Sequence, residues 1–262
     1  MTTNNMSPIV SRRFSSSSVV RSRGIYPAAL HRKHNMKEDY PARSYEIVAK
    51  RNDGSVFIGQ DRAPAIPLFE NAFSAFAQGC LVMTEKGEVA VEDLQPGERI
   101  VKADGTSAPL IWIGSSSFVL AGSGKRTPLV RVMEDSLGAG RPSSFITFGP
   151  TARVLHTPLH MRADESNQEV FTLMRDLVDG VNIIKVTPPT PVRLYHLCLE
   201  QHSAIMVGGL HVETYHPGDN LMTEMPIRHR DQFLGMFPHI ISEKDFGSLC
   251  YPRVPNKAQT LM

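Results

Sequence analysis

The sequence lacks any long apolar run, which excludes the simplest way of crossing a membrane. No stretch of its 262 residues approaches the ~18 consecutive apolar residues of a transmembrane helix. The N-terminus also lacks the continuous apolar segment of a secretory signal peptide. We therefore expect no membrane span.

Cysteine is scarce. The three cysteines, Cys80, Cys198 and Cys250, are odd in number and far apart in the chain. This spacing predicts neither a disulfide framework nor a zinc knuckle. We expect two or three buried thiols in a reduced compartment, the cytoplasm, with no metal ion and no other cofactor.

Acidic residues are absent from residues 1–37, which contain seven Lys or Arg. Residues 38–262 therefore contain 28 − 7 = 21 basic residues and all 26 acidic residues. Their net charge is 21 − 26 = −5. A mildly acidic body argues against a nucleic-acid-binding protein. Residues 1–42 are predicted to be a disordered basic tail, although their Arg- and Ser-rich composition is also typical of an organellar transit peptide, which leaves targeting open.

Glycine and proline are plentiful, with 19 of each spread along the chain. They divide the sequence into short pieces, which favours many short strands over long helices. About ten strand-like runs with frequent turns indicate an all-β fold. One hairpin is predicted over residues 44–60, turning at Asp53-Gly54.

Three segments have a pattern typical of helices. Aromatic residues at helical spacing predict one or two turns over 69–79, apolar spacing predicts a helix over 169–180, and 230–241 is amphipathic. The stretch RAPAIPLF (62–69) is predicted to be a rigid linker that forms no helix, because it contains Pro64 and Pro67.

These observations divide the chain into four predicted parts. They are a disordered basic tail (1–42), a strand hairpin with a proline-rich linker (43–68), a β domain (69–220) and a mostly irregular C-terminal extension (221–262).

The stretch GEVAVEDLQPGERIVKADGTSAPLIWIG, which begins at Gly87, resembles the opening of the Hint domain, the module shared by Hedgehog proteins and inteins. It looks closest to the bacterial stand-alone members of that family. Later blocks agree in order, among them GRPSSFITFGPTARVL and VRLYHLCLEQHSAIMVGGLHVETYHPG, so the resemblance covers roughly residues 72–240. It implies a horseshoe of short twisted strands with its chemistry at the N-terminus of the domain.

The resemblance also implies a self-directed acyl transfer. The first residue of such a domain, usually Cys and sometimes Ser or Thr, attacks the preceding peptide carbonyl and converts the amide into a thioester or ester. A histidine from a later strand assists by protonating the departing amide nitrogen. A second nucleophile or an asparagine cyclisation then releases the upstream segment.

This sequence departs from that pattern at both catalytic positions. When Gly79, Thr84 and Gly87 are matched to the family's opening, the nucleophile position falls on Ala75. In the later block the histidine position falls on Ala152, and the chain ends in Gln-Thr-Leu-Met rather than His-Asn. Since alanine neither attacks nor transfers a proton, we predict a degenerate Hint domain without self-cleavage, which acts as a structural or interaction module for an unidentified protein partner.

A second hypothesis retains activity by using another nucleophile. Cys80 follows Gly79, and an N-to-S acyl shift at this Gly-Cys bond would release the upstream residues. His156, His160 or His202 would then serve as acid or base. Against this, Cys80 lies five residues beyond the aligned nucleophile position, which would shorten the first strand.

A third hypothesis is a hydrolase or metal site built from His196, His202 and His216. Imidazole is a common zinc ligand. However, the sequence contains no His-Glu-x-x-His pattern and no paired cysteines, so structural histidines at strand ends are the simpler interpretation.

Overall fold

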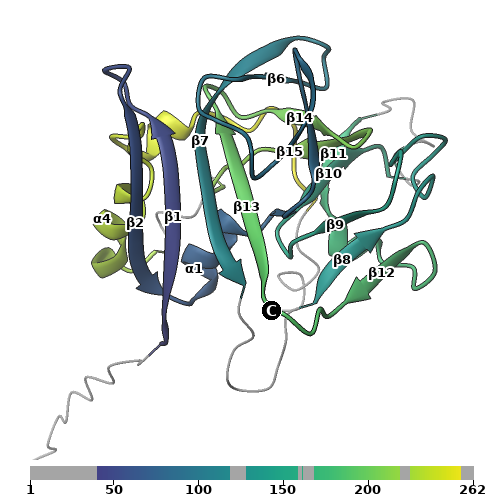
Figure 1. Cartoon of the computed structure of the whole chain (residues 1–262), viewed down its shortest axis with the longest axis horizontal. Helices are drawn as coiled ribbons and strands as arrows, with labels where there is room; N and C mark the ends of the chain where they lie inside the picture. The colour runs from purple at the N-terminus through teal and green to yellow at the C-terminus, as the bar shows by residue number, and fades with distance from the viewer. Residues whose placement is uncertain (1–39, 119–127, 159–160, 162–167, 219–224, 255–262) are drawn as a thin grey trace, which may run out of the picture. The chain divides into compact units, whose positions relative to one another are not determined.

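The computed structural model describes residues 40–118, 128–158, 161, 168–218 and 225–254 (Figure 1). The predicted tail lies outside the described residues up to residue 39, and so does His160. The rest is dominated by β-strands, which confirms the predicted all-β fold. Among the described helices, none combines the length and the apolar character needed to cross a membrane.

The described strands join edge to edge in one antiparallel sheet. Its main path runs β11-β10-β15-β14-β4-β6-β7-β13-β3-β9-β8-β12, and β1, β2 and β5 are attached at its side. The bounds are β1 (Ala42–Lys50), β2 (Val56–Pro64), β3 (Phe76–Ala77), β4 (Leu81–Thr84), β5 (Gly87–Ala90), β6 (Arg99–Val101), β7 (Ser107–Phe118), β8 (Leu129–Val132), β9 (Ile146–Phe148), β10 (Arg153–His156), β11 (Val170–Leu173), β12 (Ile183–Val186), β13 (Val192–Leu199), β14 (Ala204–Val207) and β15 (Leu210–Glu213).

Strand β7 connects the two halves of this sheet. Its first residues pair with β6, and the remainder pairs with β13 and β1. Buried apolar residues of both halves, such as Val82 of β4 and Phe148 of β9, belong to one core cluster. The sheet therefore folds over a shared core instead of remaining flat, as expected for a large twisted sheet.

The predicted N-terminal hairpin is confirmed as β1 and β2. Its turn is closed by the Asp53 carboxylate, which accepts a hydrogen bond from the Ser55 backbone N–H at 2.9 Å, and by Gly54, which has a φ of +85° that favours glycine. Because β1 also pairs with β7, the hairpin extends the main sheet. The four-part division of the chain remains a prediction.

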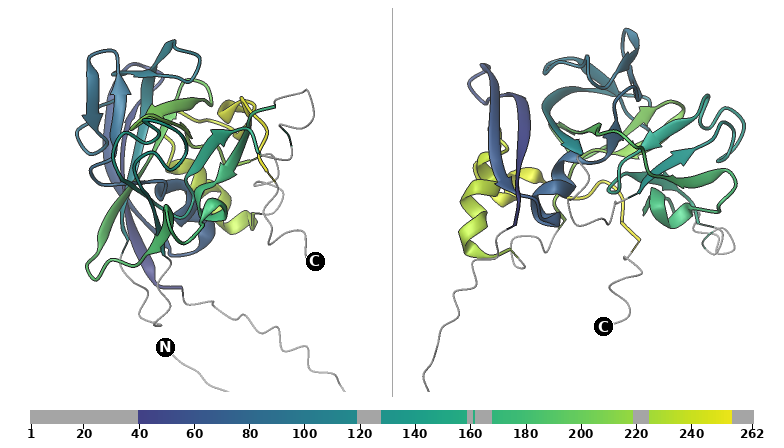
Figure 2. Two further views of the ribbon diagram at one scale, coloured as in Figure 1. Left: turned by 90° about the vertical axis from the view of Figure 1, so that its right-hand side faces the viewer. Right: turned by 60° about the horizontal axis from the view of Figure 1, so that its bottom comes forward.

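The C-terminal extension is packed onto this hairpin. Helix α4 (Ile227–Gly235) lies beside β1 and β2 (Figure 2), and Gln232 donates to the Arg62 carbonyl at 2.9 Å. Trp112 Nε1 donates to the Met236 carbonyl at 2.8 Å within an aromatic cluster. Beyond the 3₁₀ turn η3 (Glu243–Phe246), Val254 N donates to the Phe171 carbonyl of β11 at 2.9 Å. The last described residue thus lies against the sheet.

The prediction that 62–69 forms no helix was wrong. Pro64 ends β2, and Pro67 begins the short helix α1 (Pro67–Glu70). A proline in the first turn of a helix removes only an N–H that has no intrahelical partner, so it begins helices readily. The predicted helical turns over 69–79 are present only as α1 and the 3₁₀ turn η1 (Asn71–Phe73), before β3.

The predicted helix over 169–180 was wrong in its first half. Val170–Leu173 form β11, which pairs with β10, and only the 3₁₀ turn η2 (Met174–Leu177) follows. All four β11 residues are buried. A strand covered on both faces has no alternation of polar residues, so its apolar run matched helical spacing by coincidence.

Candidate functional site

The structure brings Ala75 and Ala152, the two alanines predicted to occupy the family's catalytic positions, into one region. The Gly149 backbone N–H donates to the Ala75 carbonyl at 2.8 Å, and the Thr151 N–H donates to the Ser74 carbonyl at 3.3 Å. Ala75 and Ala152 are 0% and 1% exposed and belong to the same core cluster. Two positions inferred from separate sequence blocks therefore lie on backbone segments that are hydrogen-bonded to each other.

This contact is close enough to require a glycine. A Cβ at Gly149 would lie 2.0 Å from the Ser74 carbonyl oxygen. The hydroxyl groups of Ser74 and Thr151 also lie 3.2 Å apart, within hydrogen-bonding distance. Sequence reasoning missed this hydroxyl pair, because it depends on the packing of residues 77 positions apart.

Cys80, the alternative nucleophile, is a buried thiol. Its side chain donates to the Thr147 carbonyl at 3.3 Å, and the residue is only 4% exposed. Burial raises the pKa of Cys80 to about 12, and the nearby charge of Glu92 acts in the same direction. A thiol in such surroundings is held in its unreactive protonated form.

The histidines proposed as partners of Cys80 have polar contacts elsewhere. His156 Nε2 lies 2.9 Å from the Thr172 hydroxyl. His202 Nδ1 accepts from the Cys250 backbone N–H at 3.1 Å, and its side chain is fully buried. Among the residues that the structure describes, the Cys80 side chain makes no hydrogen bond with a histidine.

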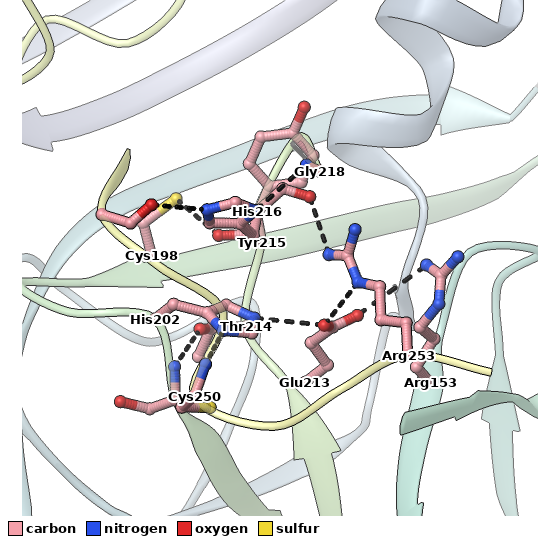
Figure 3. Close-up of polar contacts among 12 residues, drawn as sticks. Arg153, Cys198, His202, Glu213, Thr214, Tyr215, His216, Gly218, Cys250 and Arg253 are labelled. Carbon is pink, nitrogen blue, oxygen red and sulfur yellow. Dashed lines mark hydrogen bonds and ion pairs between the residues drawn. The ribbon is translucent and has the colours of Figure 1, made fainter. Parts of the chain in front are cut away.

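A buried charge cluster, which sequence reasoning also missed, surrounds Glu213 at the end of β15 (Figure 3). Its Oε1 accepts from Arg253 Nε at 2.8 Å and lies 3.1 Å from His202 Nε2. Its Oε2 lies 3.8 Å from Arg153 Nη1. Burial pushes the pKa of Glu213 upward, but His202 and the two arginines outweigh burial and leave the pKa below its ordinary value.

A cavity of about 150 Å³ lies beside this cluster and extends to Pro150 and Thr151, next to the family positions. Its polar and aromatic lining includes Arg153, Arg175, His196, Glu213, Tyr215 and Arg253. Burial lowers the pKa of His196 to about 3, and the positive charges of Arg253 and Arg153 lower it further against the opposing effect of Glu213. His196 is therefore a neutral imidazole at neutral pH.

Of the three histidines in the metal hypothesis, His202 and His216 are in ring contact with each other, and His196 is in ring contact with Tyr215. The rings of His202 and His216 have centroids 5.1 Å apart, whereas His196 packs edge-on against Tyr215. Across the described ranges, no group of three or more His, Cys, Asp or Glu residues could hold a metal ion.

Two solved structures are similar to part of this chain. No curated protein matches the chain. The solution structure of a bacterial intein-like domain from Clostridium thermocellum is similar at 14% identity and a TM-score of 0.38, over 55% of this chain and 99% of that one. The crystal structure of the MchDnaB-1 intein is similar at 15% identity and a TM-score of 0.34, over 54% of this chain and 100% of that one.

The family comparison covers more of the chain. The family model described as the Hint domain matches residues 74–219, which is more than half of the chain and includes both alanine positions. The resemblance seen in GEVAVEDLQPGERIV is thereby confirmed, and this chain belongs to the Hint domain family.

Proposed function

We propose that this Hint domain protein does not cleave itself and acts as a β-rich structural or interaction module for a protein partner. The observation that carries the proposal is the pair of methyl groups at Ala75 and Ala152, where the family's reaction requires a nucleophile and a histidine. Replacing catalytic groups of this kind by alanine costs several orders of magnitude in rate.

The packing around both alanines supports this proposal. Each is almost completely buried in the main apolar cluster, and the hydrogen bond from Gly149 to the Ala75 carbonyl holds the two segments together. A larger polar side chain at either position would have to displace neighbouring core atoms. These two positions are packed as part of a hydrophobic core, which is consistent with a structural role and not a catalytic one.

The alternative is self-cleavage at Gly79-Cys80 through an N-to-S acyl shift. A thiol with a pKa of about 12 would be ionised in roughly one molecule in 10⁵ at pH 7. Its proton is directed to the Thr147 carbonyl, and the Gly79 backbone N–H is held by Glu92 at 2.8 Å. These contacts favour a structural thiol.

Intact-mass analysis of the full chain separates the two hypotheses. Freshly purified protein incubated for days with a thiol reductant is expected to remain at 29.0 kDa. A fragment that begins at Cys80 and disappears in Cys80→Ala would overturn the proposal. A fragment that persists in Cys80→Ala indicates proteolysis by a contaminant, so the time course is repeated with protease inhibitors until the intact chain or a Cys80-dependent fragment is obtained.

A further inference from the structure

Strand β2 is an open edge of the sheet. Among the described strands it pairs only with β1, and it lies on the side of β1 away from β7 (Figure 1). The register with β1 is continuous from Val56 to Pro64. An edge strand presents a row of backbone N–H and C=O groups, which proteins usually protect with charged residues, prolines, bulges or a covering segment.

Every second residue of β2 turns its backbone groups away from β1. At the two ends of the hairpin, the Arg51 N–H donates to the Ser55 carbonyl and the Ala65 N–H donates to the Pro41 carbonyl, each at 2.8 Å. Hydrogen-bonded and non-hydrogen-bonded positions alternate along an antiparallel pair. The odd-numbered residues of β2 therefore bond to β1. The residues that face the open edge are Val56, Ile58, Gln60 and Arg62.

One end of this edge is already occupied. The Arg62 N–H donates to the Asp61 carboxylate at 2.7 Å, and the Arg62 carbonyl accepts from Gln232 of α4 at 2.9 Å. At the other three positions, the described residues outside the hairpin supply no hydrogen bond to the backbone. The free edge therefore consists of Val56, Ile58 and Gln60.

The side chains along the free edge are uncharged and mostly apolar. Val56 and Ile58 are 55% and 78% exposed, and Gln60 is also exposed. The segment VFIGQ (56–60) contains no charged residue and no proline, so the usual protection of an edge strand is missing here. Exposed β-branched residues on such an edge are typical of a surface that binds another strand.

We propose that β2 pairs antiparallel with β2 of a second copy of this chain, with the two Ile58 residues opposite each other. In a two-fold symmetric contact, residue i meets residue j and j meets i. Centring the contact on Ile58 places Val56 opposite Gln60 of the other copy. All three free positions then become hydrogen-bonded pairs, which exchange about six hydrogen bonds in total.

Charge complementarity favours a second copy as the occupant. Within the paired segment no like charges meet, because it has no charged residue. Beyond it, Asp61 and Arg62 of each copy meet the hairpin turn of the other. That turn holds Arg51, whose guanidinium lies 4.8 Å from the centroid of the Phe57 ring, and Asp53. Opposite charges therefore face each other at both ends of the contact.

The paired segment is short, so the dimer is expected to be weak and to depend on protein concentration. The inference goes beyond the proposed loss of self-cleavage and does not rest on it, because no residue of β2 is a candidate nucleophile or acid.

Sedimentation velocity of the full chain over about a hundredfold range of concentration is the first test. We expect a reversible monomer–dimer equilibrium. Ile58→Lys would place two ammonium groups opposite each other and remove the apolar contact, so it should weaken dimerisation roughly tenfold or more. The matched control is Val181→Lys, which replaces a similarly exposed apolar residue (76%) outside β2 and should dimerise as the original chain does.

Disulfide cross-linking tests the register and does not depend on the Lys variant. It is carried out in a Cys250→Ser background, which removes the exposed native thiol. In Ile58→Cys the facing Cα atoms would lie about 5.5 Å apart, a separation that a disulfide can bridge, so mild oxidation should give a covalent dimer. In Val56→Cys the two thiols would be offset by four residues, roughly 13 Å along the strand, and should not cross-link.

Three results would overturn the inference. The first is a monomer at every concentration, which is expected if something other than a second copy covers the edge. The second is a dimer that Ile58→Lys leaves unchanged. The third is equal cross-linking of Ile58→Cys and Val56→Cys, because it would show that the two strands do not meet in this register.

Discussion

Gly149 donates its backbone N–H to the Ala75 carbonyl oxygen at 2.8 Å. This one hydrogen bond joins the first segment of the Hint domain to the turn that precedes β10. It joins the two segments that hold Ala75 and Ala152, which we predict to occupy the family's nucleophile and histidine positions.

Gly149→Ala is expected to destabilise the protein by about 1–3 kcal/mol, the usual cost of overpacking a close contact. The added Cβ would lie 2.0 Å from the Ser74 carbonyl oxygen, so one of the two segments must move. Urea denaturation measures the change. The control is Gly235→Ala, where an added Cβ has no neighbour within 4 Å; if both variants are equally stable, the contact is not tight in solution.

Alkylation should distinguish the three thiols. We expect iodoacetamide to modify Cys250, which is exposed, long before Cys80 and Cys198, which are buried. Burial raises the pKa of Cys80 to about 12 and that of Cys250 to about 11, so exposure and thiolate fraction act in the same direction. Peptide mass spectrometry over time gives the order, with urea-unfolded protein as the reference in which all three react. Modification of Cys80 as fast as Cys250 would restore it as a candidate nucleophile.

Glu213→Gln should destabilise the protein by about 3–5 kcal/mol, the cost of leaving a buried charge without its partner. The carboxylate faces Arg253, Arg153 and His202, and it is 4% exposed. Glu85→Gln, which removes an exposed carboxylate from a surface pair with Arg99, should cause no measurable change. Thermal and urea unfolding of both variants provide the comparison. A loss no larger than that of Glu85→Gln would mean that Glu213 is solvated in solution.

Stability should fall as the pH is lowered from 6.5 towards 3. Burial lowers the pKa of His196 to about 3, below the ordinary value of 6.5, so the unfolded chain binds a proton in this range that the folded chain does not. Glu213 acts in the same direction, because its lowered pKa contributes stability that is lost in acid. Burial also lowers the pKa of His216 and, to about 4, that of His239.

The measurement is the free energy of unfolding between pH 4 and 6.5. Each histidine of this kind contributes a slope of up to about 1.4 kcal/mol per pH unit. His196→Gln should reduce the slope by about that amount, even if it lowers stability throughout. An unchanged slope would show that the His196 side chain is accessible to protons in the folded state.

Local sequence patterns were sufficient for much of the fold. Turn residues at Asp53-Gly54 and β-branched runs predicted the hairpin and the all-β class, because these signals depend on neighbours along the chain. The order of motifs around VEDLQPGERIV indicated the Hint family. Residue spacing within the same motifs predicted that Ala75 and Ala152 occupy the family's catalytic positions. This prediction required no structure, because it depends only on distances along the chain.

Tertiary structure alone decided the features that depend on distant residues. Val170–Leu173 has helical spacing but forms β11, because pairing with β10 and burial on both faces outweigh a local preference. Arg253 lies 40 positions beyond Glu213, in an extension predicted to be mostly irregular, yet it completes the charge cluster. No helical or strand periodicity in the sequence predicts a contact between residues so far apart in the chain. The sequence determined which side chains the protein has, and the folding of the sheet onto itself determined which of them share a buried, low-dielectric environment where their charges interact strongly.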